Sequence, residues 1–164
     1  MKALAAAWEG NTANEKAVFE MWWIAFSEAL GVPGPATPPT GDDRFELSIP
    51  TIERDGREST NYIDYWKAGH AAVEAKASEP GRSNEQLLIK AFGQVRNYAA
   101  YIGAQPPYLI VVDVPKTLIV WDRWSGNFGG FAAGKRVALA TLHEPPPDSD
   151  PQADRRGTLL PCCR

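Results

Sequence analysis

Three residues in the stretch Asn61–Ser78 offer the side chains that a site for a hard divalent cation needs. Asp64 is followed by Glu74 and Lys76, in a segment that we predict to form two short strands joined by a tight turn at Ala68–His70. Side chains alternate along a strand, so Glu74 and Lys76 share a face. Proteins usually hold Mg²⁺ with one or two carboxylates, and water and substrate phosphate fill its other positions. Two carboxylates beside an amine therefore indicate metal-assisted chemistry on a phosphate.

The predicted hairpin, centred on Gly69, has a definite register. Its two faces hold different cross-strand pairs: Asp64 with Glu74 and Tyr62 with Lys76 on one face, Ile63 with Ala75 and Tyr65 with Val73 on the other. A slip of one residue would mix the polar and apolar sets, so the pattern favours this pairing. The alternative interpretation is a half-buried hairpin whose Glu74 and Lys76 form a solvent-facing ion pair, because short motifs of this kind also arise by accident.

Length and composition limit the classes of protein to consider. The chain has 164 residues, 44% of them hydrophobic and 23% charged, which is typical of a single globular domain. The net charge of −3 gives no bulk attraction to nucleic acid, so any contact with a polyanion has to be local. The cysteines, Cys162 and Cys163, are adjacent and exclude a disulfide framework or a zinc site. We find no membrane-spanning apolar run and no signal-peptide pattern, and we expect a cytoplasmic location.

A helix is predicted over Thr12–Leu30, before the hairpin. Thr12 and Glu15 match a capping box, and the aromatic residues that follow recur at helical spacing. Glu28 lies near the end of this helix, away from the apolar stripe. It either reaches towards the metal site or is a solvated helix glutamate.

A second helix is predicted from Ser83 to about Ile102, after the hairpin. Gln94 and Tyr98 are four residues apart and lie on one side of it. They either contact a phosphate near the metal or are a surface glutamine and a core tyrosine. Lys90 and Arg96 on the same helix could contact a nucleic-acid backbone, or they are solvated charges.

The remaining strands complete an α/β fold with a central mixed sheet flanked by helices. Beyond the hairpin we predict strands at Phe45–Pro50, Tyr108–Val114, Thr117–Asp122 and Lys135–His143. The folded domain is expected to span residues 1–144. Residues 145–164 are rich in proline and polar residues and are expected to form a disordered or aberrant tail.

The order helix, three-stranded meander, helix, strand resembles the core of the PD-(D/E)XK nuclease superfamily. Asp64, Glu74 and Lys76 stand where that superfamily carries its D…ExK signature. Gln94-x-x-x-Tyr98 is similar to the QxxxY helix motif of its RecB-like branch, and Glu28 resembles the first-helix acid that some members add to the metal site.

The resemblance is closer to the N-terminal nuclease domain of MmeI-like restriction–modification enzymes, and it covers about Phe19–Glu144. Four segments carry it, in order: FSEALGVPGPATPPTGDDRFE, IDYWKAGHAAVEAKAS, QLLIKAFGQVRNYA and PPYLIVVDVPKTLIVWDRWSG. In that family the nuclease domain precedes a helical spacer, an adenine-specific DNA methyltransferase that uses S-adenosylmethionine, and a target-recognition domain.

The resemblance implies Mg²⁺-dependent hydrolysis of a phosphodiester in double-stranded DNA, leaving a 5′-phosphate. Asp64, Glu74 and the Ala75 carbonyl would ligate the metal, with Glu28 added as in some members. Lys76 would position or activate the attacking water. Gln94 and Tyr98 would shape the phosphate pocket.

The sequence departs from the family in three respects. We expect the chain to stop where the spacer would begin, and its tail resembles nothing in the family. Gln105–Tyr108, QPPY, looks like a methyltransferase catalytic loop, but its first residue is not Asn or Asp and no cofactor-binding glycine loop accompanies it. The alternatives are therefore a truncated fragment that folds without cleaving DNA, which the acidic net charge favours, and a DNA methyltransferase, for which the parts are missing.

Overall fold

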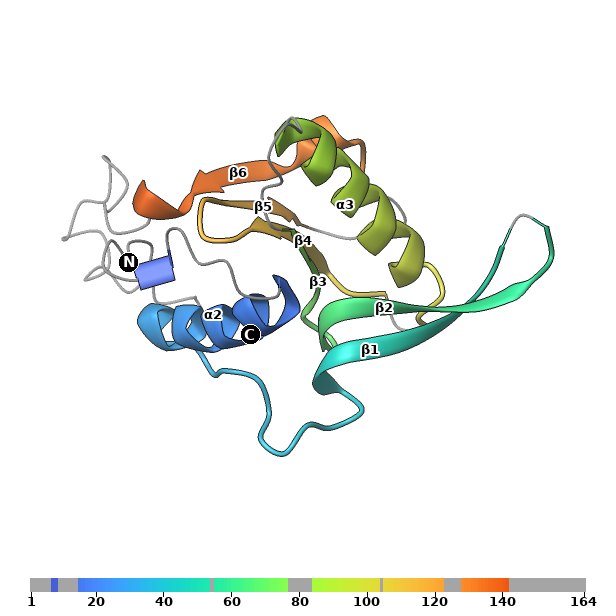
Figure 1. The fold of residues 1–164 in the computed structure, drawn as a ribbon, viewed down its shortest axis with the longest axis horizontal. Helices are drawn as coiled ribbons and strands as arrows, with labels where there is room; N and C mark the ends of the chain where they lie inside the picture. The colour runs from blue at the N-terminus through green and yellow to red at the C-terminus, as the bar shows by residue number, and fades with distance from the viewer. Residues whose placement is uncertain are drawn as a thin grey trace, which may run out of the picture.

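A computed structural model describes residues 7–8, 15–53, 55–76, 84–103, 105–122 and 128–141 of the chain, which form a mixed sheet between two helices (Figure 1). The helices are α2 (Glu15–Leu30) and α3 (Asn84–Ala99). The strands are β1 (Asp43–Ile52), β2 (Glu58–Lys67), β3 (Ala71–Lys76), β4 (Tyr108–Asp113), β5 (Thr117–Trp121) and β6 (Lys135–Ala138). Two short 3₁₀ helices, η1 (Phe131–Ala133) and η2 (Leu139–Thr141), flank β6.

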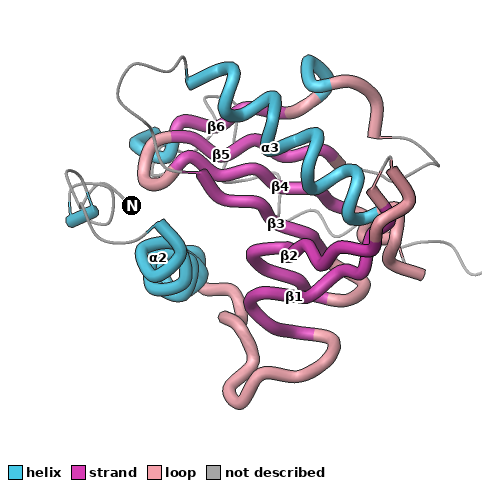
Figure 2. The backbone as a smooth tube through the Cα atoms, turned by 45° about the vertical axis from the view of Figure 1, so that its right-hand side comes forward, coloured by secondary structure: helices cyan, strands magenta, loops and turns pink. Residues whose placement is uncertain are grey.

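The six strands lie in the sheet in the order of the sequence, β1-β2-β3-β4-β5-β6. All neighbouring pairs are antiparallel except β3 and β4, which run parallel. A parallel pair needs a long crossover connection, and α3 lies in that connection. Figure 2 shows α3 lying across one face of the sheet and α2 near the other.

Each helix packs on its own face of the sheet. Leu88, Phe92 and Val95 of α3 join a core with Leu109 and Val111 of β4. On the other face the core of α2 combines its aromatic residues with neighbouring strand residues: Phe19, Trp22, Trp23 and Phe26 with Tyr65, Val73, Ala75, Val112 and Leu118. Neither described helix is long and apolar enough to cross a membrane.

The predicted element order is confirmed as a mixed α/β arrangement with a mixed sheet and two helices. The strand predicted at Phe45–Pro50 extends two residues further at each end, because it pairs along its whole length with β2. The strand expected over Lys135–His143 ends at Ala138 and continues as η2. Thr12, Ser83 and the tail at 145–164 lie outside the described residues.

The side chains of β1 and β2 change sides of the sheet at one point along the two strands. Phe45 packs on the α2 side of the sheet, whereas Leu47 packs on the α3 side, and Glu46 between them has φ of 53°. Opposite, Tyr65 lies on the α2 side and Ile63 on the α3 side, with Asp64 between them. A non-glycine residue at positive φ costs of order 1–2 kcal/mol, so the surrounding packing has to hold Glu46 there. Beyond this point β1 and β2 project past the rest of the sheet (Figure 1).

A half-buried ion pair anchors the base of this projecting hairpin. The Asp43 carboxylate accepts a hydrogen bond from the Tyr65 hydroxyl at 2.9 Å and forms an ion pair with Lys67 Nζ at 2.8 Å. Burial alone would raise the pKa of Asp43, but the bonds from Lys67 and Tyr65 hold that pKa below its ordinary value. Burial and the neighbouring Asp43 charge raise the pKa of Tyr65. The start of β1 is thereby fixed to the end of β2.

We expect Asp43→Asn to lower the free energy of unfolding by about 1–2 kcal/mol at pH 7, because it removes a charge-assisted hydrogen bond. A carboxyl with a depressed folded pKa stabilises the protein above its unfolded pKa of about 3.9. That contribution is lost as the pH falls through the folded pKa, so the two proteins should converge at low pH. Urea unfolding between pH 7 and pH 3 measures this. Asp42→Asn, at an exposed neighbour, is the control, and an equal loss in both variants would contradict the anchor.

Candidate metal and phosphate site

The strand β3 carries an ion pair on the side of the sheet that α3 covers. Ala72 packs in the α3-side core, and side chains two and four residues further point the same way. These residues are Glu74 and Lys76, and Lys76 Nζ lies 2.7 Å from Glu74 Oε1. Glu74 is only 3% exposed, whereas the Lys76 side chain is 23% exposed. The pair is therefore buried at the glutamate and reaches solvent at the lysine, unlike the solvent-facing pair of the alternative interpretation.

Asp64 lies where β2 leaves β3. The ladder pairs between these strands run from Lys67↔Ala71 to Tyr65↔Val73. One residue beyond, the Asp64 carboxylate accepts a hydrogen bond from the Ala75 N–H at 2.7 Å. This side chain replaces the main-chain acceptor that β2 would otherwise supply to β3.

The Ala75 carbonyl faces the same gap between β2 and β3. The N–H and C=O of a strand residue point to the same edge of the strand. Since the Ala75 N–H reaches Asp64, the Ala75 carbonyl is directed towards β2 as well. The neighbouring Lys76 carbonyl faces β4, where it accepts a bond from the Val114 N–H at 3.3 Å. The structure thus brings Asp64, Glu74, Ala75 and Lys76 together at one end of β3.

The predicted hairpin register is confirmed where the two strands pair. Tyr65 lies opposite Val73, as the polar and apolar pattern indicated. Tyr62, which was expected opposite Lys76, pairs with Ser48 of β1 but not with β3, because the β2–β3 ladder ends at Tyr65. Asp64 consequently approaches β3 through its side chain rather than through a ladder pair with Glu74.

Gln94 and Tyr98 lie on α3 with different surroundings. The Tyr98 hydroxyl donates to Asn61 Oδ1 at 3.2 Å, and Asn61 Nδ2 donates to Thr51 Oγ1 at 2.7 Å. Tyr98 is thus bound to the projecting hairpin, three residues before Asp64 along β2. The Gln94 Oε1 atom is buried and has no hydrogen-bond partner among the described residues. A buried amide oxygen without a donor is costly, so Gln94 is the residue of this motif with capacity for a further ligand.

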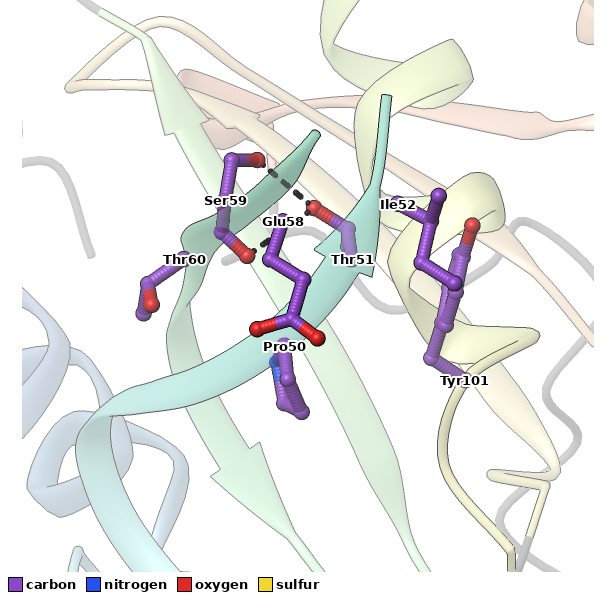
Figure 3. Close-up of a pocket in the computed structure, with 7 residues that line it drawn as sticks. All are labelled: Pro50, Thr51, Ile52, Glu58, Ser59, Thr60 and Tyr101. Atoms are coloured by element: carbon purple, nitrogen blue, oxygen red, sulfur yellow. Dashed lines mark hydrogen bonds between the residues drawn. The ribbon is translucent and has the colours of Figure 1, made fainter. Parts of the chain in front are cut away.

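The projecting hairpin carries a separate depression of about 570 Å³ (Figure 3). Its lining combines polar and apolar groups: Pro50, Thr51, Ile52, Glu58, Ser59, Thr60 and Tyr101. The Thr51 and Ser59 hydroxyls are 2.9 Å apart, and Ser59 donates to Glu53 at 2.7 Å. None of the predicted site residues lines this depression, and its Thr51 and Ser59 hydroxyls are already engaged with one another.

Glu28 is exposed on α2, which packs on the opposite side of the sheet from Glu74. Among the described residues no three His, Cys, Asp or Glu side chains are grouped so that they could hold a metal ion. Glu28 therefore does not complete a three-acid group with Asp64 and Glu74 in this arrangement.

The remaining donors still suit Mg²⁺ by their chemistry. Asp64, Glu74 and the Ala75 carbonyl supply hard oxygen atoms, and Mg²⁺ needs only one or two protein carboxylates when water and phosphate complete its shell. The buried Glu74 carboxylate forms an ion pair with Lys76. A second positive charge at this end of β3 would be electrostatically favourable.

Asp113 and Asn84, which lie beside this group, are two further polar residues that the D…ExK pattern does not include. Asp113 ends β4 and is 1% exposed, and Asn84, the first residue of α3, donates to it at 2.5 Å. Asp113 is the acid inside the apolar run YLIVVDV, and an acid in such a run is the signal that would have drawn attention to it.

Comparisons with known proteins identify no relative. No family model matches the sequence, no curated protein matches it, and no solved structure matches it. The functional interpretation therefore depends on the residues and on the geometry described above.

We expect Lys76→Met to lower the free energy of unfolding by about 2–3 kcal/mol, because it leaves the buried Glu74 carboxylate without this cation. The double variant Glu74→Gln/Lys76→Met should recover part of that loss, since it removes the carboxylate charge as well. Chemical denaturation without divalent ions measures both effects.

Lys90→Met, at an exposed position of α3, is the matched control for this substitution and should change stability by less than about 0.5 kcal/mol. Equal stability of Lys76→Met and Lys90→Met would show that the ion pair contributes nothing.

Proposed function

We propose that this chain is a Mg²⁺-dependent DNA endonuclease domain of a restriction–modification protein, with a PD-(D/E)XK-type site. The observation that carries the proposal is the meeting of Asp64 with the Glu74–Lys76 pair at the place where β2 leaves β3. Two carboxylates, a strand carbonyl and an amine at one sheet opening are the groups that phosphodiester hydrolysis requires.

The arrangement of the elements supports the proposal. The resemblance implies helix, three-stranded meander, helix and strand, and α2, β1–β3, α3 and β4 follow one another in that order. The parallel pairing of β3 with β4 places the start of α3 at the same end of the sheet as Lys76 and Asp113. The candidate groups therefore come from separate elements that meet at one end of β3.

The chain's own residues have separable roles in this reaction. Asp64, Glu74 and the Ala75 carbonyl would hold Mg²⁺, which when bound neutralises phosphate charge and lowers the pKa of water. The Lys76 ammonium, partly open to solvent, orients the attacking water by donating to it. Water attacks phosphorus and the bond to the 3′ oxygen breaks, so that one product carries a 5′-phosphate and the other a 3′-hydroxyl. Gln94 would help to shape the phosphate pocket, because its amide NH2 group would donate to a phosphate oxygen and its buried amide oxygen, which lacks a donor, would accept a hydrogen bond from water.

Contacts with double-stranded DNA would have to be local, given the net charge of −3. Lys90 and Arg96 are exposed on α3. The Arg96 guanidinium lies 5.7 Å from the centre of the Phe92 ring, and this packing holds it against the helix. In the full-length family most DNA contacts belong to the methyltransferase and target-recognition domains, so weak binding by this domain alone accords with the proposal.

The second candidate is a fragment that binds Mg²⁺ without cleaving DNA. The acidic net charge favours it, because it leaves few cations to hold a nucleic acid. The two candidates share the metal site and differ in turnover.

We expect the chain to nick supercoiled plasmid DNA in Mg²⁺ and not in EDTA. Lys76→Ala should lower the rate at least about a hundredfold, because a group that positions the nucleophile contributes that much to many hydrolases. Lys135→Ala is the matched control, since that exposed lysine lies on β6 and pairs with Asp122. Equal Mg²⁺-dependent nicking by the parent chain and Lys76→Ala would remove the catalytic assignment.

Metal binding can be measured separately from cleavage. We expect Mg²⁺ to raise the thermal midpoint of the parent chain and to have little effect on Glu74→Gln, because a ligand that binds only the folded state stabilises it. A Mg²⁺-dependent shift without nicking supports the non-cleaving fragment. The absence of any shift, in a chain that also fails to nick, would rule out both candidates.

A further inference from the structure

Asp113, at the end of β4, is not part of the D…ExK signature. Asp113 is 1% exposed, and with Glu74 it is one of two acids among the described residues that are buried. An ionised carboxylate in an interior is unfavourable unless cations or hydrogen-bond donors surround it. The position of Asp113 therefore needs a physical reason.

Asp113 lies on the same face of the sheet as the Glu74–Lys76 pair. Leu109 and Val111 of β4 pack in the α3-side core, and Asp113 follows them by two residues, so its side chain points to the same side. In the parallel ladder Asp113 pairs directly with Lys76. Neighbouring strands are about 4.8 Å apart, so the two residues are adjacent on one face of the sheet, with opposite charges on neighbouring strands.

Asp113 is also fixed to the helix that carries Gln94. Asn84 Nδ2 donates to Asp113 Oδ2 at 2.5 Å, and Asn84 is the first residue of α3. The main chain tightens the same corner, because the Lys116 N–H donates to the Asp113 carbonyl at 2.6 Å. One carboxylate thus joins the end of β4 to the start of α3, beside the last residue of β3.

We propose that Asp113 is a positioning residue of the candidate site, whose charge directs the Lys76 ammonium and whose bond to Asn84 fixes α3 against β3. A hydrogen bond to Asn84 alone would not require an acid, since a neutral amide could accept it. The negative charge is needed because Lys76 already pairs with Glu74, and a second carboxylate on the neighbouring strand limits the directions in which its ammonium can point. The inference rests on the proposed nuclease function for its catalytic consequence, but not for the pairing itself.

The pairing is tested by thermal unfolding without divalent ions, in the parent chain and in the Lys76→Met background. Asp113→Asn should lower the midpoint in the parent chain, where it removes the partner of a cation. In the Lys76→Met background it should raise the midpoint, because it then relieves repulsion between Asp113 and Glu74. An equal decrease in both backgrounds would overturn the inference, since it would mean that Asp113 acts independently of Lys76.

The catalytic consequence is tested by plasmid nicking with the same variants. Asp113→Asn should lower kcat about tenfold and leave KM within about twofold, because a misdirected Lys76 affects the reaction rather than DNA binding. Asp122→Asn, an acid after β5 that pairs with the exposed Lys135, is the control and should leave both parameters unchanged. An unchanged kcat in Asp113→Asn would overturn the positioning role.

A second variant covers the case in which Asp113→Asn fails to fold. Asn84→Ala removes the donor to Asp113 and leaves every charge in place, and it should lower kcat about threefold with KM unchanged. An unchanged kcat here would also contradict the inference. A parent chain that never nicks DNA would instead refute the proposed nuclease function, while the unfolding experiment would still decide whether Asp113 and Lys76 are coupled.

Discussion

The structure depends on the place where β2 separates from β3. Antiparallel strands normally satisfy one another's main-chain groups along their whole length, and a strand that departs early leaves donors without acceptors. Here the Asp64 carboxylate takes the Ala75 N–H, so that the sheet can open without an unsatisfied donor at this position. The same opening directs the Ala75 carbonyl towards the gap. One side chain therefore both stabilises the branch in the sheet and contributes to the candidate site that the branch creates.

Charge is distributed unevenly around this branch. Glu74 and Asp113 are buried, Asp64 is half-buried, and the one lysine on the same strand face, Lys76, reaches solvent. A neighbourhood richer in carboxylates than in cations is stable only where hydrogen bonds or additional positive charge compensate it. Asn84 and the Ala75 N–H supply part of that compensation from within the protein. Under the proposed function, a divalent ion and the Lys76 ammonium would supply the rest when a phosphate binds.

The sequence allowed prediction of those features that depend on local pattern. The hairpin pairing of Tyr65 with Val73 followed from alternation around Gly69, and both helices followed from apolar periodicity. The point at which the side chains of β1 and β2 change sides could not be predicted. It depends on the positive φ of Glu46, and a glutamate in the sequence does not indicate that conformation. The sequence indicates only that Asp113 belongs to a buried apolar strand. Its neighbour across the sheet is Lys76, and this depends on a parallel pairing between segments that are more than thirty residues apart in the chain. Asp64 and Glu74 could be found from their spacing in the sequence. Asp113 could be placed beside them only once the pairing of β3 with β4 was known.

The outer edge of the sheet has a consequence for how copies of this protein meet one another. Strand β1 is ten residues long and, among the described residues, pairs with a neighbouring strand on one side only, which would ordinarily make it a template for another chain's strand. Its regular run is interrupted twice, by the left-handed backbone at Glu46 and by Pro50, which has no N–H to donate. An incoming strand would find matched partners over only a few residues between these interruptions. The length of β1 is therefore a poor template for sheet extension between molecules.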